Sequence, residues 1–174
     1  STTSNGALNL NAANINIDRA TTTANRVTIN ATVLSNRAGH ISQTGVGQTE
    51  VVASQSLDNT AGKIESNGNA TVTAPTLVNS QGRIASAKDV SITANSSADN
   101  TDGTVIAAQH ILLTGGNLAN TNGEIQAASG NATINVADLS NTGGNVYAGS
   151  NLSTSAANVT NSGNLYAAGN QILH

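Results

Sequence analysis

A short motif recurs along the chain with a period of about 20 residues. Its most regular member is an asparagine, in steps of 23, 20, 21, 20, 21 and 20 residues: Asn36, Asn59, Asn79, Asn100, Asn120, Asn141 and Asn161. A glycine follows most of these asparagines after three residues, and Gly163 fits if the last repeat lacks one residue. A disordered tract has no reason to keep such a register, so the repeat predicts a stack of similar structural units.

Aliphatic residues keep the same register in three sets. One set lies two residues before each asparagine: Leu34, Leu57, Leu77, Ala98, Leu118, Leu139 and Val159. A second lies two residues after each glycine: Ile41, Ile64, Ile84, Val105, Ile125, Val146 and Leu165. The third lies five residues before the first: Ile29, Val52, Val72, Thr93, Leu113, Ile134 and Thr154, with Ile92 expected to replace Thr93 as the inward residue.

Within each repeat the spacing is two residues, which is typical of strands rather than helices. Short runs such as "ATVTA" (70–74) and "ATINV" (132–136) alternate, and their Thr, Val and Ile favour a pleated surface. A propeller blade needs about 40 residues, and a leucine-rich repeat has another leucine pattern. The sequence therefore predicts an all-β parallel β-helix with one coil of about 20 residues per repeat.

This fold explains an unusual composition. The chain has two tyrosines, no Phe, Trp, Met or Cys, and 9% charged residues. Its core must come from stacked aliphatic residues, and the asparagines are expected to form an amide ladder at one corner. Asparagine and glycine favour left-handed and turn positions, which suit such corners. Without cysteine, neither disulfides nor thiolate metal sites can form.

Seven repeats are predicted over residues 25–174, and residues 1–24 are expected to form an irregular first coil or linker. That gives about eight coils. The last coil, "NLYAAGNQILH", still carries core-type residues with no cap after them. We therefore expect an internal piece of a longer stack, which associates end to end when it is isolated.

The repeats "LDNTAGKIESNGNATVTA", "LVNSQGRIASAKDVSITA" and "LANTNGEIQAASGNATINV" resemble the haemagglutinin repeats of the filamentous haemagglutinin family. The resemblance covers residues 25–174. It implies a right-handed β-helical shaft and secretion to the outer cell surface of a Gram-negative bacterium. It also implies an outer-membrane two-partner-secretion transporter as export partner. Members of this family include adhesins and contact-dependent inhibition filaments, and the family supplies no catalytic residues.

Two outward features are candidates for ligand binding. His40, Lys63 and Arg83 follow the corner glycine in consecutive repeats and would form a basic column. Residues 1–88 carry six basic and four acidic residues, net +2, whereas residues 89–174 carry five acids and no Lys or Arg. The N-terminal half, which contains the basic column, therefore favours an anionic ligand. Tyr147 and Tyr166 share one column in adjacent repeats and would form a stacking pair, either as a sugar platform or as a shield over the sheet.

We expect no enzyme, cofactor or metal site. The three histidines occupy different places in the repeat, and the nine acids are scattered. The main hypothesis is a structural shaft segment of a large secreted adhesin or filament, which presents a binding or toxin module away from the cell. The alternative is a module whose coil face itself grips a cell-surface receptor, glycan or other anionic ligand. A polysaccharide-acting β-helix enzyme is a remote third. No nucleic-acid partner is expected.

Overall fold

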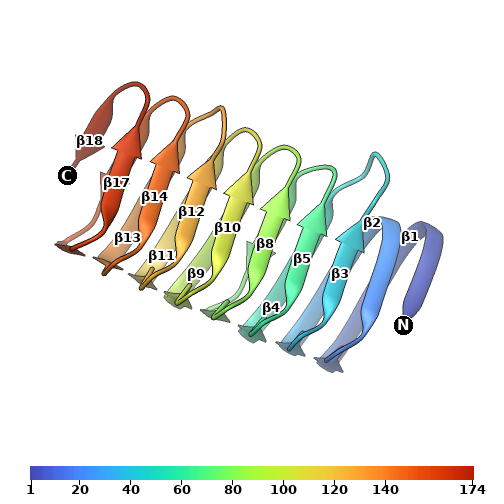
Figure 1. The fold of residues 1–174 in the computed structure, drawn as a ribbon. Helices are drawn as coiled ribbons and strands as arrows, with labels where there is room; N and C mark the ends of the chain where they lie inside the picture. Colours follow the sequence, from blue (N-terminus) through green and yellow to red (C-terminus); the bar gives the residue numbers. More distant parts are fainter.

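Eighteen strands and no helix make up the computed structural model, which describes residues 1–174 (Figure 1). The strands are β1 (Thr2–Asn16), β2 (Thr21–Ser35), β3 (His40–Gln43), β4 (Thr49–Asp58), β5 (Lys63–Ser66), β6 (Ala70–Thr73), β7 (Thr76–Val78), β8 (Arg83–Ser86), β9 (Val90–Asp99), β10 (Thr104–Ala107), β11 (Ile111–Ala119), β12 (Glu124–Ala127), β13 (Ala132–Asn141), β14 (Asn145–Ala148), β15 (Leu152–Ser155), β16 (Asn158–Asn161), β17 (Asn164–Ala167) and β18 (Gln171–Leu173). No helix of the kind that could cross a membrane is present.

Every strand pairs in parallel with the equivalent strand of a neighbouring coil, which confirms the predicted parallel β-helix. One sheet, called here the front sheet, consists of β3, β5, β8, β10, β12, β14 and β17 and faces the viewer in Figure 1. Residues 21–24 of β2 extend it, and Thr2–Ser4 of β1 pair with β2 in turn. The front sheet therefore has nine strand segments, and the stack has nine coils rather than eight.

The core is a set of continuous aliphatic columns inside the coils. The register joins Ile41, Ile64, Ile84, Val105, Ile125, Val146 and Leu165 as direct neighbours. The column that begins at Leu34 is likewise joined from coil to coil. Most members of both columns are fully buried. Because a coil is only one strand thick, its aliphatic residues leave water only when another coil covers them.

The prediction for the third column is wrong at Val52. Its expected replacement of Thr93 by Ile92 is confirmed. The structure pairs Ile29 with Val51, and Val51 is buried whereas Val52 is only half-buried. The coil between Asn36 and Asn59 is longer than the others. It has a longer turn before β4 and one extra residue within β4, between Ala53 and Ser56, where the register with β2 shifts. In the next coils Val72 pairs with Ile92, and Ile92 rather than Thr93 enters the core, as expected.

That longer coil has a projecting turn between β3 and β4, which rises above the neighbouring connections in Figure 1. Gly45, Val46 and Gly47 lie in it, and the Val46 side chain is fully exposed. Pro75 lies between β6 and β7, where no strand hydrogen bond is lost.

Residues 1–24 contribute β1 and the first part of β2. Thr2–Ser4 and Ala7–Asn16 pair with β2, with one shift of register between Ser4 and Ala7. Leu10 and Ile15 pair with Ile29 and Leu34, so these residues extend two core columns of the stack.

Candidate functional site

The repeated asparagines form one unbroken row of side-chain hydrogen bonds at the corner that leads into the front sheet. The Nδ2 of each donates to the Oδ1 of the next, over 2.6–2.7 Å, from Asn36 through Asn161. Six of the seven side chains are buried. Asn59 and Asn79 also donate to the carbonyl oxygens of Gly62 and Gly82 in their own coils. The ladder thus gives a polar corner its hydrogen bonds without water, as buried amides require.

The row begins at Asn36, whose buried Oδ1 has no partner. The equivalent position in the preceding coil is Ile17: its N–H donates to Ser35 O, as the N–H of Asn36 donates to Asp58 O. An isoleucine cannot donate a hydrogen bond, so the ladder stops there.

Glycine is required at these corners because a side chain would have no space there, not because the backbone takes a positive φ angle. A Cβ on Gly82 would lie 2.3 Å from the carbonyl oxygen of Asn59 and 2.6 Å from Asn79 Oδ1. The left-handed residue is instead the one directly before the glycine, including Ala61 at φ 53° and Gln81 at φ 56°. The expectation that asparagine and glycine would take the left-handed positions is therefore wrong for these corners, apart from Asn122 and Gly143.

The predicted basic column exists as a geometric row on the front sheet. His40 pairs with Lys63, and Lys63 pairs with Arg83. However, Glu65 reaches over from the next outward column: its two carboxylate oxygens bind His40 Nε2 at 2.8 Å and Arg83 Nε at 3.0 Å. Partial burial raises the pKa of Glu65, but the hydrogen bonds from Arg83 and His40 outweigh it and hold that pKa below its usual value. Two of the three basic side chains, His40 and Arg83, are thus already paired with Glu65.

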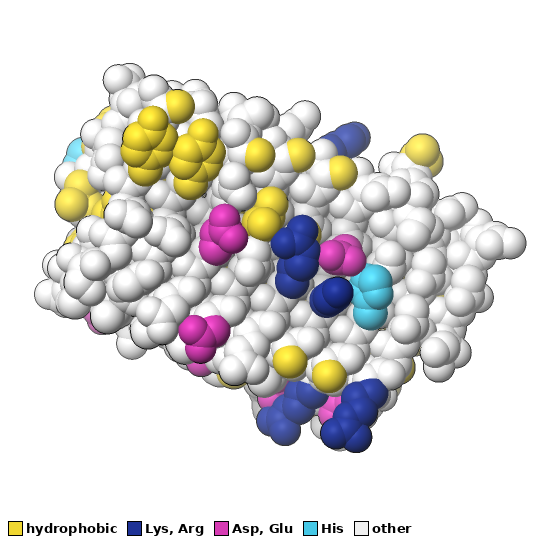
Figure 2. All heavy atoms as spheres, in the orientation of Figure 1, with side chains coloured by type: hydrophobic (Ala, Val, Ile, Leu, Met, Phe, Trp, Pro, Cys, Tyr) yellow, Lys and Arg dark blue, Asp and Glu magenta, His cyan; other side chains and the backbone are white.

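The two tyrosines lie on the same front sheet. Tyr147 and Tyr166 are paired neighbours, with ring centroids 5.5 Å apart and planes inclined by 10°. The basic residues and the tyrosines come from alternate positions of equivalent strands, so their side chains share one face. In Figure 2 charged side chains are grouped over the middle of this face, and hydrophobic ones gather near its C-terminal end. Sequence reasoning treated the two features separately.

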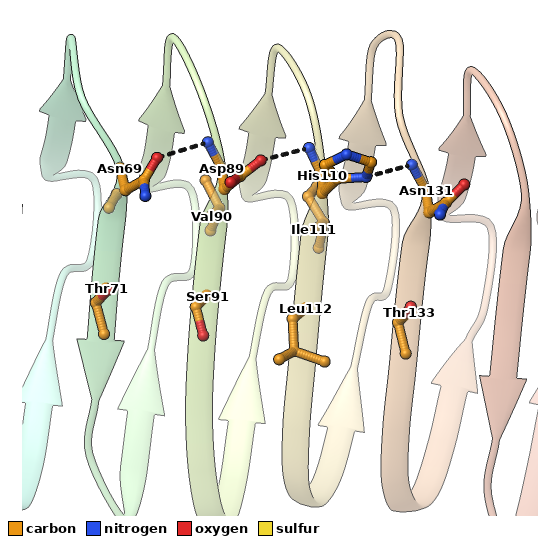
Figure 3. A pocket seen from close by; sticks show the side chains of 11 residues that line it. Asn69, Thr71, Asp89, Val90, Ser91, His110, Ile111, Leu112, Asn131 and Thr133 are labelled. Atoms are coloured by element: carbon orange, nitrogen blue, oxygen red, sulfur yellow. Dashed lines mark hydrogen bonds between the residues drawn. The ribbon is translucent and has the colours of Figure 1, made fainter.

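A second corner row was missed altogether. Asn69, Asp89, His110 and Asn131 each precede the second strand of a coil, and the side chain of each accepts the backbone N–H of the next residue in the row (Figure 3). Asn151 continues the row. The signal was hidden because the position needs only a hydrogen-bond acceptor, which Asn, Asp and neutral His all supply.

A hollow lies beside this second row. Thr71, Ser91, Leu112 and Thr133 line it, and Leu112 is 42% exposed between the hydroxyl residues (Figure 3). The His110 Nδ1 accepts from Asn131 N at 3.0 Å, so it serves as a structural acceptor. No group of three His, Asp or Glu side chains converges anywhere in the chain.

Comparison with known proteins adds one match. Residues 3–61 match the model of the haemagglutinin repeat family. No curated protein and no solved structure matches the chain. The matched segment includes residues 3–24, which lie outside the predicted repeats, and it runs from β1 to the second asparagine corner, at Asn59. This match confirms the resemblance of the chain to the filamentous haemagglutinin family.

Proposed function

We propose that the chain is a section of a secreted filament that holds a binding or toxin module away from the cell. The observation that supports this proposal is the continuity of the columns: equivalent aliphatic positions recur from coil to coil, and the asparagine ladder is unbroken from Asn36 to Asn161. The haemagglutinin repeat and the β-solenoid fit the shaft of an adhesin-type exoprotein, and the repeat implies a secreted, extracellular bacterial protein.

The physics of the stack suits a spacer. Each coil packs only against its two neighbours, so length grows by about 4.8 Å per coil without any change in cross-section. Backbone hydrogen bonds run along the filament axis from coil to coil, which makes the stack stiff in that direction. Export through an outer-membrane two-partner-secretion transporter, and contact with a host or bacterial receptor, belong to this proposal.

The proposal predicts that whole coils are interchangeable. In the full-length protein on its cell, residues 79–99 form one coil between two ladder asparagines, and their deletion joins equivalent positions. We expect normal secretion and unchanged adhesion or toxin delivery. A matched deletion of residues 85–94 removes half a coil and should block folding and display. If loss of one whole coil abolishes adhesion while display stays normal, the segment is itself the binding module.

A second candidate is that the front sheet binds a ligand directly. The bridging by Glu65 favours a structural role for His40 and Arg83, so an anionic ligand on this column would have to displace an internal pair. The observation that favours ligand binding is instead the stacked tyrosine pair on the same sheet, of which Tyr166 is 55% exposed.

A further inference from the structure

The C-terminal part of the front sheet has a hollow of about 510 Å³ around the two tyrosines. Its outward side chains come from three consecutive strands, β12, β14 and β17: Glu124, Gln126, Asn145, Tyr147, Asn164 and Tyr166. The tyrosines are the only aromatic residues of the chain, and both lie here. We propose that this hollow binds an uncharged carbohydrate, with pyranose rings against the tyrosines and hydroxyl groups on the neighbouring polar side chains.

The aromatic surface is only partly used by the protein. Rings with centroids 5.5 Å apart are offset rather than fully overlapped, and Tyr166 remains 55% exposed. Burial of an aromatic ring in water-excluding contact is favourable, and the apolar C–H face of a pyranose supplies such contact. The Tyr166 ring therefore keeps apolar surface that a ligand could cover.

That polar row offers both acceptors and donors. Asn164 Nδ2 donates to Asn145 Oδ1 at 2.7 Å, which aligns the two amides and leaves Asn145 Nδ2 and Asn164 Oδ1 free. The carboxylate of Glu124 has no hydrogen bond or ion pair within the chain. Sugar hydroxyls donate and accept at once, so a set of aligned amides and one carboxylate matches them.

Charge selects the class of carbohydrate. No lysine or arginine lines the hollow, and its one charged group is the Glu124 carboxylate. A sulfated or carboxylated sugar would be repelled there. The basic column is separate: Arg83 lies three coils before Asn145 in the same row, through Thr104 and Glu124. The site is therefore predicted to prefer neutral glycans.

The stack also sets the direction of the ligand. Tyr147 and Tyr166 are one coil apart, a spacing of about 4.8 Å. This is comparable with the length of one pyranose in a linear chain, so a glycan lying along the filament axis would place successive rings near successive tyrosines.

The test uses tyrosine fluorescence, which reports on this hollow alone because the chain has no tryptophan. The chain 1–174 is titrated with cellotetraose, maltotetraose and chitotetraose, and with tetragalacturonate as the anionic comparison. We expect a saturable change with at least one neutral sugar. No saturable change with any of the three overturns the proposal, and so does tighter binding of tetragalacturonate.

Variants assign the binding to the hollow, with affinities measured by calorimetry. Tyr166→Ala and Glu124→Ala should each weaken binding by roughly 3–10-fold, since one ring contact or one hydrogen bond contributes about 1 kcal/mol. Leu112→Ala, an exposed apolar residue outside this hollow, is the matched control. Equal affinity in Tyr166→Ala with unchanged circular dichroism also overturns the proposal. Failure here leaves the shaft function standing, because the coil-deletion test does not depend on sugar binding.

Discussion

The Nδ2 of Asn79 donates to the Oδ1 of Asn100 at 2.7 Å, and Asn79 Oδ1 accepts from Asn59 at the same distance. Each asparagine is therefore a buried donor and a buried acceptor in one chain of amides. Breaking the chain at one place leaves a buried group unpaired in the next coil, and such a group costs more than an average hydrogen bond.

Asn79→Ala should lower the free energy of unfolding by roughly 1–3 kcal/mol. It leaves Asn100 Oδ1 without its donor, whereas Asn59 Nδ2 keeps the carbonyl oxygen of Gly62. Urea unfolding measures the loss. Asn117→Ala is the control, because the Asn117 side chain is exposed and makes no hydrogen bond. An equal effect of both substitutions would mean that the ladder contributes nothing specific.

Gly82→Ala should be more damaging than Asn79→Ala. The new methyl group would meet backbone at 2.3 Å, and a backbone carbonyl held by the stack cannot move aside cheaply. We expect loss of several kcal/mol or failure to fold, measured by thermal unfolding. Gly6→Ala is the matched control, since its nearest neighbour would lie at 3.9 Å. A stable, well-folded Gly82→Ala protein would show that the corner is looser than this geometry.

Ala61→Gly should stabilise the chain, which is unusual for a change to glycine. Ala61 has φ 53° and is exposed, so the substitution relieves a left-handed alanine and gives up little burial. We expect a gain of up to about 1 kcal/mol, reduced by the greater freedom of glycine in the unfolded chain. Ala128→Gly, at an exposed residue with negative φ, should instead lower stability. The two changes in melting temperature should have opposite signs.

Acid should weaken the stack through Asp58, Asp99 and Glu65. Burial raises the pKa of Asp99, but hydrogen bonds from Thr101 and Ser80 outweigh it and lower that pKa. At Asp58, too, burial raises the pKa, but hydrogen bonds from Thr60 and Arg37 outweigh burial and lower that pKa. A carboxylate with a depressed folded pKa contributes stability above its unfolded pKa, and this is lost as pH falls through the folded pKa.

We therefore expect the melting temperature to fall below about pH 4.5 and to be flat above it as far as these groups are concerned. Asp99→Asn should lower stability at pH 7 and make the acid decline shallower. Glu50→Gln serves as the control, because the Glu50 carboxylate makes no hydrogen bond or ion pair. A decline of unchanged slope in Asp99→Asn would remove this carboxylate from the explanation.

The fold could be predicted from the sequence alone, because the core residues of a solenoid recur at a nearly constant interval along the chain. The columns of Ile64 and Leu57 could be read directly, since every coil places the same residue type at the same point. Val52 was mistaken for Val51 because both are aliphatic and β4 has an extra residue between Ala53 and Ser56, which shifts its register with β2. The partner of Arg83 could not be found this way: Glu65 lies in another coil and another column.

The second corner row shows a different limit. Asn69, Asp89 and His110 share a geometry but no residue type, so a search for repeated letters passes over them. The reason for the corner glycines was hidden too, because the clash is with the backbone of the preceding coil. The local sequence indicates only where the chain is prone to turn, whereas glycine is required at these positions by close contact with the preceding coil.

The open C-terminal coil provides the last prediction, for the isolated chain 1–174. Leu173 is 54% exposed and Ile172 47%, and the strand edges of β16, β17 and β18 carry unpaired backbone groups. The other end of the stack presents Leu10 and Ile15 in the core columns that Leu173 and Val159 occupy at this end.

Open edges with matching columns favour addition of another coil. We therefore expect reversible head-to-tail association, with sedimentation showing a mass that rises with protein concentration. Leu173→Lys places a charge in that interface and should keep the chain monomeric. Leu112→Lys adds the same charge on the side of the stack and should not. If both variants sediment like the parent chain, association does not run through the end of the stack.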